Sequence, residues 1–183
     1  MNTGAVTPDA ILDFWQGAGE TRWFTRSAAF DGALAVRFGA ALAQARDGAF
    51  EDWTATPRGA LAHVILLDQL SRNIHRGSPL MFAGDRRALA IAKQAVGRGF
   101  HRAFPGPEAV WFIMPFEHAE DLDGQWRGVG LFESMGLNSM VYWAKLHLDI
   151  IARFGRFPHR NPILGRTSTA EEVAFLTAGG FSG

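Results

Sequence analysis

The stretch SAAFDGALAVRFGAALAQAR, Ser27 to Arg46, indicates the fold class of the chain, because large apolar residues recur in it at every fourth position. These residues are Phe30, Leu34, Phe38 and Leu42. A spacing of four places them along one side of an α-helix, where they form the apolar stripe that a helix buries in a globular protein. No segment of the sequence alternates apolar and polar residues as a half-buried strand does. The sequence therefore predicts an all-α protein.

Helix signals lie on both sides of this stretch. Thr7 followed by Pro8 is typical of a helix cap and first turn, and predicts a first helix that ends at Gly17. We expect a loop through 22–24 to lead from it to the second helix. A second signal of the same kind, Thr56 and Pro57, predicts the start of the third helix. Pro115 is expected to force a restart at Phe116, and Asn138 to cap the helix that follows. The later predicted helices cover 57–77, 85–97, 108–113, 116–135 and 139–154.

Two further signals complete the predicted order of helices. The FPGP stretch, 104–107, is the strongest break in the chain. Gly155 is expected to end the long helix before it, and an arginine-rich loop then leads to a last helix, which starts with a capping box of Ser168 and Glu171 and ends at Gly179. We therefore expect seven to eight helices, joined by short connections and packed as antiparallel helical hairpins.

Length and composition bound the kind of protein. The chain has 183 residues, of which 48% are hydrophobic and 20% charged, and this predicts a single globular domain over 1–183. Lys and Arg together number 18, as do Asp and Glu, so no overall field favours nucleic acid or an anionic membrane as a partner. The absence of cysteine excludes disulfides, thiolate metal sites and cysteine nucleophiles. We expect a cytoplasmic protein, because the sequence shows no secretory signal and no apolar run of membrane-spanning length.

Charge is concentrated locally in two places. The stretch RFGRFPHRNPILGR, 153–166, contains four arginines, and the stretch 117–123 contains four acidic residues. We expect these two clusters to pair with each other in a partly buried ionic network. Perturbed charges gather at sites that bind or react, so the network also marks a candidate cleft.

Three segments carry residues that could do chemistry. In LLDQLSRNIHR, 66–76, Asp68 and Arg72 stand at i and i+4, which fits either an exposed helix ion pair or part of a site. In PFEHAEDLDGQW, 115–126, the acids fit the first turn of a helix, while Glu117, His118 and Asp121 could also converge on a divalent metal. His147 lies on an apolar helix face, and this favours a hydrogen-bonded core histidine.

Three blocks of the sequence, LLDQLSRNIHRGSP, MPFEHAEDLDGQ and IARFGRFPHRNPILGRTSTAEEVAFL, closely resemble the signature blocks of a bacterial family, domain of unknown function 924. The resemblance covers essentially the whole chain and implies a tetratricopeptide-like, right-handed superhelical arrangement of helices with no established activity. Ala119 stands where the family usually has serine, so a serine nucleophile at this position is excluded. Leu70 and Ser71 stand where the family usually has Phe-Pro.

The motif positions of these blocks give the predicted site. We expect a binding module whose groove holds an anionic small molecule or an acidic protein segment, because planar guanidinium groups pair with carboxylates and phosphates. The predicted ligand-binding residues are Asp68, Arg72, Asn73, Arg76, Glu120, His147, Arg153, Arg156, His159, Arg160 and Asn161.

The alternative is a hydrolase in which Glu117, His118 and Asp121 bind a metal or act as general acid and base. No nucleotide-binding loop, dinucleotide fingerprint or Gly-x-Ser-x-Gly motif accompanies them, so the sequence leaves open whether the protein is an enzyme. We predict no cofactor, with a divalent metal as an option, and the sequence leaves a homodimer open.

Overall fold

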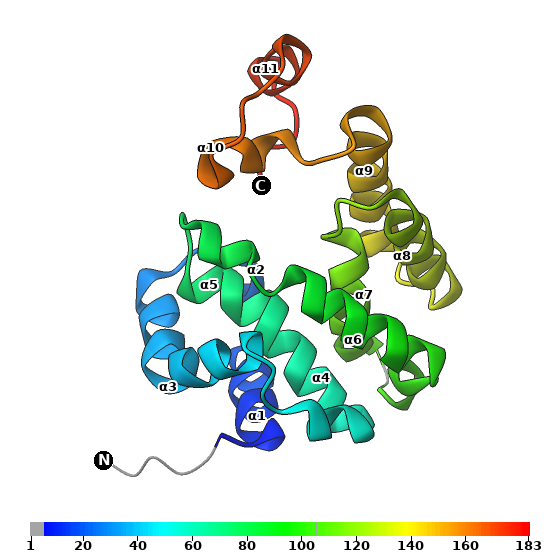
Figure 1. Cartoon of the computed structure of the whole chain (residues 1–183). Coiled ribbons are helices and arrows are strands. Elements are labelled where there is room, and N and C mark those ends of the chain that lie inside the picture. The colour runs from blue at the N-terminus through cyan, green and yellow to red at the C-terminus, as the bar shows by residue number, and fades with distance from the viewer. Residues whose placement is uncertain (1–5, 105) are drawn as a thin grey trace. The chain divides into compact units, whose positions relative to one another are not determined.

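A computed structural model of the chain describes residues 6–104 and 106–183, and Figure 1 shows that these are built from helices and connecting turns. No strand occurs among the described residues, so the all-α prediction is confirmed. Within residues 6–104 and 106–183 the α-helices number ten where the segments labelled α4 and α5 are taken as one continuous helix. The expected seven to eight was too low, because two connections predicted as loops contain short helices.

The chain divides into two compact units. The N-terminal unit comprises Met1–Arg76 and Leu80–Pro115, and the C-terminal unit comprises Gly77–Pro79 and Phe116–Gly183. The prediction of one domain over the whole chain stays a prediction. Among the described residues, no helix combines the length and the apolar character needed to cross a membrane.

Helices of the N-terminal unit follow the predicted order closely. Thr7, Ser27 and Thr56 each accept a hydrogen bond from a backbone N–H in the first turn of the helix that they cap, and such a cap stabilises a helix by about 1 kcal/mol. The α-helices of this unit are α1 (Pro8–Ala18), α2 (Glu20–Phe24), α3 (Ala28–Arg46), α4 (Pro57–Ile65), α5 (Ser71–Ile74), α6 (Asp85–Gly97) and α7 (Val110–Glu117), the last of which continues into the C-terminal unit. Five shorter helical turns join them: η1 (Glu51–Ala55), η2 (Leu66–Leu70), η3 (Pro79–Phe82), η4 (Phe100–Ala103) and η5 (Gly106–Ala109).

The core of the N-terminal unit is aromatic. All four residues of the predicted stripe of α3 are buried. Trp15 of α1 is fully buried and meets the ring of Trp111 edge to face, with 5.3 Å between ring centroids. Trp23 of α2 meets the same indole at 5.0 Å. The segment predicted as a loop through 22–24 is therefore a short helix that places one aromatic ring against the core.

A π-helical turn, η2, joins α4 to α5 without a break. The sequence predicted one regular helix over this stretch. Every residue of the turn is buried, Asp68 included. A π turn widens the helix by one residue and is frequent at functional sites. Gly84 packs against this turn so closely that a Cβ atom at its position would overlap the carbonyl oxygen of Leu67.

Two predicted boundaries are wrong in the region of the acidic block. Helix α7 runs through Pro115 to Glu117, and the break comes afterwards, at 118–121. The side chain of Gln125 explains the break, because its amide donates to the backbone oxygens of Glu117 and Ala119, both at 2.7 Å. Glu117 therefore lies at the end of a helix and not at a helix start. The predicted break at 104–107 falls partly on residue 105, which lies outside the described residues.

The C-terminal unit is built on a helical hairpin of α8 (Leu122–Ser134) and α9 (Asn138–Phe154), which lie side by side in Figure 1. Asn138 is the first residue of α9 and not its cap. Gly155 ends α9 in the left-handed conformation, at φ 69°, as the sequence predicted. The segment that follows is not a plain loop, since it forms η6 (Pro158–Arg160) and α10 (Asn161–Leu164) before α11 (Ala170–Thr177).

The capping box of α11 lies one residue later than predicted. Thr169 accepts a hydrogen bond from the N–H of Glu172 at 3.2 Å, and a carboxylate oxygen of Glu172 accepts one from the N–H of Thr169 at 2.7 Å. Ser168 and Glu171, the predicted pair, have other contacts. The hydroxyl of Ser168 accepts a hydrogen bond from the side chain of Asn161, and Glu171 lies exposed beside Arg153.

Candidate functional site

The motif residues of the third predicted helix form a buried ionic network within the N-terminal unit. Nη1 of Arg72 lies 3.0 Å from Oδ1 of Asp68 and donates to Oδ1 of Asp85 at 2.8 Å. Burial alone would lower the pKa of Arg72, but the two carboxylates raise it. Gln69 donates to the other oxygen of Asp68 at 2.6 Å. The reading of Asp68 and Arg72 as an exposed ion pair is wrong, because the carboxylate of Asp68 is fully buried in the π turn.

Asn73 and Arg76, from the same block, both hold Asp31 of α3. The amide of Asn73 donates to Asp31 at 2.8 Å, and Nε of Arg76 donates to it at 2.8 Å. Burial raises the pKa of Asp31, but the hydrogen bonds from Arg76 and Asn73 outweigh this effect and lower it. These two side chains therefore join α5 and the turn that follows it to α3.

Glu120 anchors the arginine-rich segment of the C-terminal unit. Arg166 donates to its two carboxylate oxygens at 2.6 and 2.9 Å, and the backbone N–H of Phe157 donates at 2.8 Å. Burial would raise the pKa of Glu120, but these hydrogen bonds and the positive charges of Arg160 and Arg166 lower it. The expected pairing of the acidic block with the arginine-rich segment occurs here.

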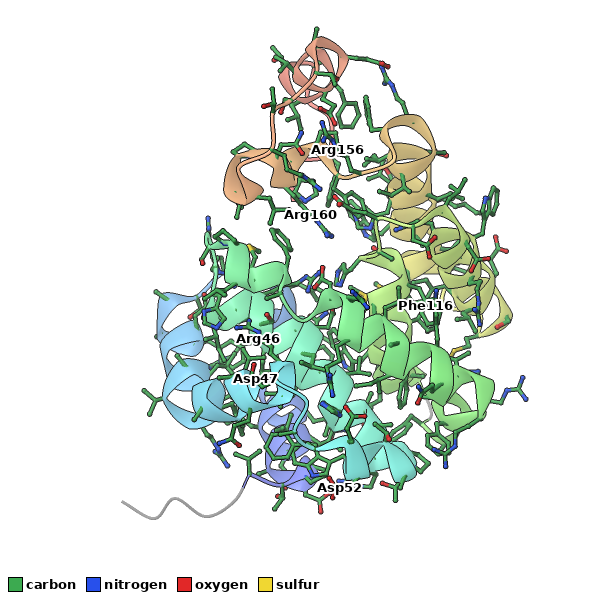
Figure 2. All side chains as sticks on the ribbon, in the orientation of Figure 1. Arg46, Asp47, Asp52, Phe116, Arg156 and Arg160 are labelled. Carbon is green, nitrogen blue, oxygen red and sulfur yellow. The ribbon has the colours of Figure 1, made fainter. Side chains whose placement is uncertain are left out.

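Glu172 of α11 accepts hydrogen bonds from two further residues of the arginine-rich segment, Arg156 and Asn161. Arg156 donates to its two oxygens at 2.6 and 2.8 Å, and the amide of Asn161 donates at 3.2 Å. The hydrogen bond from Arg156, together with the N–H of Thr169, lowers the pKa of Glu172 to about 2 although burial acts in the opposite direction. Arg153 pairs with Glu171 at the surface. Figure 2 labels Arg156 and Arg160 in this segment.

These contacts explain why so many guanidinium groups follow α9. Arg153, Arg156 and Arg166 are each matched by a glutamate of the C-terminal unit. Arg160 donates from Nη2 to the backbone oxygen of His118 at 3.0 Å and stacks over the ring of Phe157. The arginines thus hold the segment 156–172 to the unit. A ligand-binding role for them, as for Arg72 and Arg76, stays a prediction.

Glu117 and His147 form a buried pair of a different kind. Oε1 of Glu117 lies 2.8 Å from Nδ1 of His147, and both side chains are at least nine-tenths buried. Nδ1 of His147 thus faces the carboxylate, whereas Nε2 of His147 and Oε2 of Glu117 are buried and have no hydrogen-bond partner among the described residues. The prediction of a buried core histidine is confirmed, and one of its two ring nitrogens faces Glu117.

Aromatic rings surround this pair. The ring centroid of His147 lies 5.2 Å from that of Phe157 and 4.6 Å from that of Phe181. Phe181 also lies 5.2 Å from the ring of His159. Burial, followed by the charge of Arg160, lowers the pKa of His159 to about 4, so this imidazole is neutral at pH 7. Sequence reasoning did not single out Phe181, because nothing local marks it.

The predicted trio of Glu117, His118 and Asp121 is divided among separate contacts. Asp121 is exposed and caps α8 by accepting a hydrogen bond from the N–H of Gly124 at 3.1 Å. Among the residues that the structure describes, no three His, Asp or Glu side chains are arranged to hold a metal ion. The divalent metal that the sequence left open therefore has no ligand set in that part of the chain. The side chain that faces Glu117 is His147.

Comparison with known proteins identifies the family to which the chain belongs. Residues 11–180 match the family described as "Bacterial protein of unknown function (DUF924)". The solved structure of a protein of unknown function from Agrobacterium tumefaciens superposes with a TM-score of 0.90 at 40% sequence identity, and the match covers 94% of this chain and 97% of that one. The comparison with curated proteins gives no match.

Proposed function

This chain belongs to DUF924, a family of bacterial proteins of unknown function, and from the chemistry of its own side chains we propose that it binds a small anionic molecule at Glu117 and His147. The observation that carries the proposal is the set of buried polar atoms without partners on these two residues. A buried polar group that lacks a hydrogen bond costs about 1 to 3 kcal/mol. A ligand that supplies the missing partners recovers that cost, and its binding is favoured accordingly.

The atoms of the pair define the chemistry of the ligand. Glu117 presents Oε2, which accepts hydrogen bonds when the carboxylate is ionised. His147 presents Nε2, which donates a hydrogen bond in the tautomer that carries a proton on this nitrogen. An anionic oxygen, from a carboxylate or a phosphate, would accept from Nε2, while a hydroxyl or amino group on the same molecule would donate to Oε2. Hydroxy acids and phosphorylated sugars combine both groups.

Acid–base chemistry at the same pair is the second candidate. A carboxylate beside Nδ1 of a histidine favours the tautomer that carries its proton there, and Nε2 is then free to take a proton from a substrate. The 2.8 Å contact between Glu117 and His147 favours this pairing over the predicted one with His118 and Asp121. In this reading Glu117 orients the imidazole and His147 is the general base.

Phe181 packs against the imidazole of His147, so a ligand that reaches this ring must displace Phe181 or pass it. Its ring packs on both His147 and His159. Truncation of this side chain, Phe181→Ala, would open the imidazole to solvent. We expect the variant to bind and release ligand faster than the wild type, which stopped-flow fluorescence can follow.

A thermal-shift screen of the full chain against phosphorylated sugars and hydroxy acids tests the proposal. A ligand present at about one hundred times its dissociation constant stabilises the folded state by about 2.7 kcal/mol. We expect Glu117→Gln and His147→Asn to lose this shift. Asp123→Asn, an exposed carboxylate of the same acidic block, is the matched control and should keep it. Equal shifts in the wild type and in both site variants would exclude the pair as the binding site.

Product analysis separates the two candidates. A ligand that is recovered unchanged supports a binding module. Conversion of the ligand by the wild type, lost in His147→Asn even at a ligand concentration high enough to fill a weakened site, supports acid–base catalysis. The tetratricopeptide-like superhelix and the cytoplasmic location belong to the proposal as well, since both rest on the family resemblance and the sequence.

A further inference from the structure

An open cleft of about 850 Å³ lies on the N-terminal unit, along α1, α2 and α3. Its walls include two stacked rings, Phe14 and Phe30, whose centroids are 5.8 Å apart. Ala29 and Ala33, one helical turn apart on α3, also line it. The lining of the cleft is therefore mostly apolar. None of these residues belongs to the blocks from which the sequence predicted a site.

Two arginines of the cleft differ from the arginines of the predicted site. Arg22 and Arg37 line the cleft and are exposed, and within the described residues neither has a carboxylate partner. The guanidinium of Arg37 lies over the ring of Phe14, 5.1 Å from its centroid. In another hollow of the same unit, by contrast, Arg58 donates to Asp9 at 2.6 Å. Asp13 is the acidic residue of the cleft lining, so positive charge predominates there.

The outer face of α3 is also unusually apolar for an exposed surface. Val36, one turn after Ala33, is 91% exposed, and Phe24 at the end of α2 is 63% exposed. Small residues at i and i+4 allow the backbone of another helix to approach closely.

We propose that this cleft docks an acidic amphipathic helix from a partner protein. The apolar face of such a helix would lie on Phe14 and Ala33, and its carboxylates would pair with Arg22 and Arg37. The described residues offer no strand edge to which a peptide could add, so a helix in the groove is the binding mode that fits. The acidic segment that the sequence predicted as a partner is thus assigned to a surface that the motifs did not indicate.

Fluorescence anisotropy of labelled peptides with the full chain tests this inference. The probe is a designed helix of about 16 residues, with Leu and Phe at i, i+3, i+4 and i+7 and Glu on the flanks. Two control peptides have the same composition in scrambled order, or Lys in place of Glu. We expect the acidic helix to bind, and the two controls to bind at least about tenfold more weakly, because positive charge and helical apolar spacing are both required.

Variants of the cleft locate the binding. Ala33→Glu introduces a charge into the apolar floor, and the double variant Arg22→Glu with Arg37→Glu reverses the charge of the rim. Both variants should bind the acidic peptide at least about tenfold more weakly than the wild type does. Arg86→Glu is the matched control, since Arg86 is an exposed arginine of α6 outside the cleft lining, and it should bind as the wild type does.

Three results would overturn the inference. The first is that the acidic helix binds no better than its controls. The second is that Ala33→Glu binds it unchanged. The third is a wild-type dimer that Ala33→Glu converts to a monomer in light scattering, because a second copy of the chain would then cover this face. None of these results bears on the proposed ligand site at Glu117 and His147, since that pair lies in the other unit.

Discussion

Two neighbouring glutamates, Glu171 and Glu172, have the same chemistry and very different surroundings. Glu171 pairs with Arg153 at the surface, where both side chains are more than half exposed. Glu172 is buried and accepts hydrogen bonds from Arg156, Asn161 and the N–H of Thr169. An exposed ion pair contributes about 0 to 1 kcal/mol, whereas a buried carboxylate with several donors fixes the segment around it.

Replacement of these glutamates by glutamine distinguishes the two environments. The folded state lowers the pKa of Glu172 from 4.5 to about 2. The unfolded chain therefore takes up a proton at a higher pH than the folded chain does. The stability that this group contributes is present above about pH 4.5 and is lost as the pH falls toward 2. We expect Glu172→Gln to be less stable than the wild type at pH 7 and to show a flatter loss of stability between pH 4.5 and 2.

Urea unfolding followed by circular dichroism at a series of pH values measures this difference. Glu171→Gln is the control, and it should lower the free energy of unfolding at pH 7 by less than about 1 kcal/mol. If the two variants have equal stability at pH 7, the contacts of Glu172 do not hold the segment in solution.

At the scale of elements, the sequence located most helices and misjudged where some of them end. The caps at Thr7, Ser27 and Thr56 act within one turn, so they can be recognised locally. The box at α11 was ambiguous, because Ser168 with Glu171 and Thr169 with Glu172 satisfy the same pattern. Contacts of Glu172 with Arg156 and Asn161 decide between the two, and these contacts span more than ten residues of chain.

The π turn between α4 and α5 gives a prediction for a single glycine. A Cβ atom at Gly84 would overlap the carbonyl oxygen of Leu67, and its nearest neighbours are backbone atoms that cannot rotate away. We expect Gly84→Ala to lower the free energy of unfolding by more than about 2 kcal/mol. Thermal unfolding measures the change.

Gly32→Ala is the control for that experiment. Gly32 lies within α3, and a Cβ atom there meets nothing within 4 Å. This variant should be stabilised by up to about 1 kcal/mol, because alanine favours the helix. A Gly84→Ala protein as stable as the wild type would mean that α6 does not pack against the π turn this closely.

At the scale of the whole molecule, each unit contains a histidine that is neutral at pH 7 and makes the folded state less stable in acid. His63 of the N-terminal unit is fully buried beside Trp53, and neither of its ring nitrogens has a hydrogen bond within the described part of the chain. Burial lowers its pKa from 6.5 to about 4. Burial likewise lowers the pKa of His159, in the C-terminal unit, to about 4. The unfolded chain binds protons at these positions between about pH 6.5 and 4, and the folded chain does not. Stability is therefore present above pH 6.5 and is lost as the pH falls to about 4.

Acid unfolding of His63→Leu tests this origin of the pH dependence. For His63 the loss between pH 6.5 and 4 is on the order of 3 kcal/mol, and leucine has no proton to bind. We expect His63→Leu to unfold with a shallower pH dependence in this range, as followed by tryptophan fluorescence. An unchanged slope would show that His63 does not set it.

The sequence by itself determined the helical class, most helix starts and the three polar blocks, because each of these depends on residues within a few positions of one another. Only the tertiary structure decided which polar residues meet. Glu117 faces His147 and not His118, and Glu120 meets Arg166. These partners lie tens of residues apart, and their distance depends on how α7, α8 and α9 pack. Burial then decides which of their polar atoms are satisfied and which remain for a ligand.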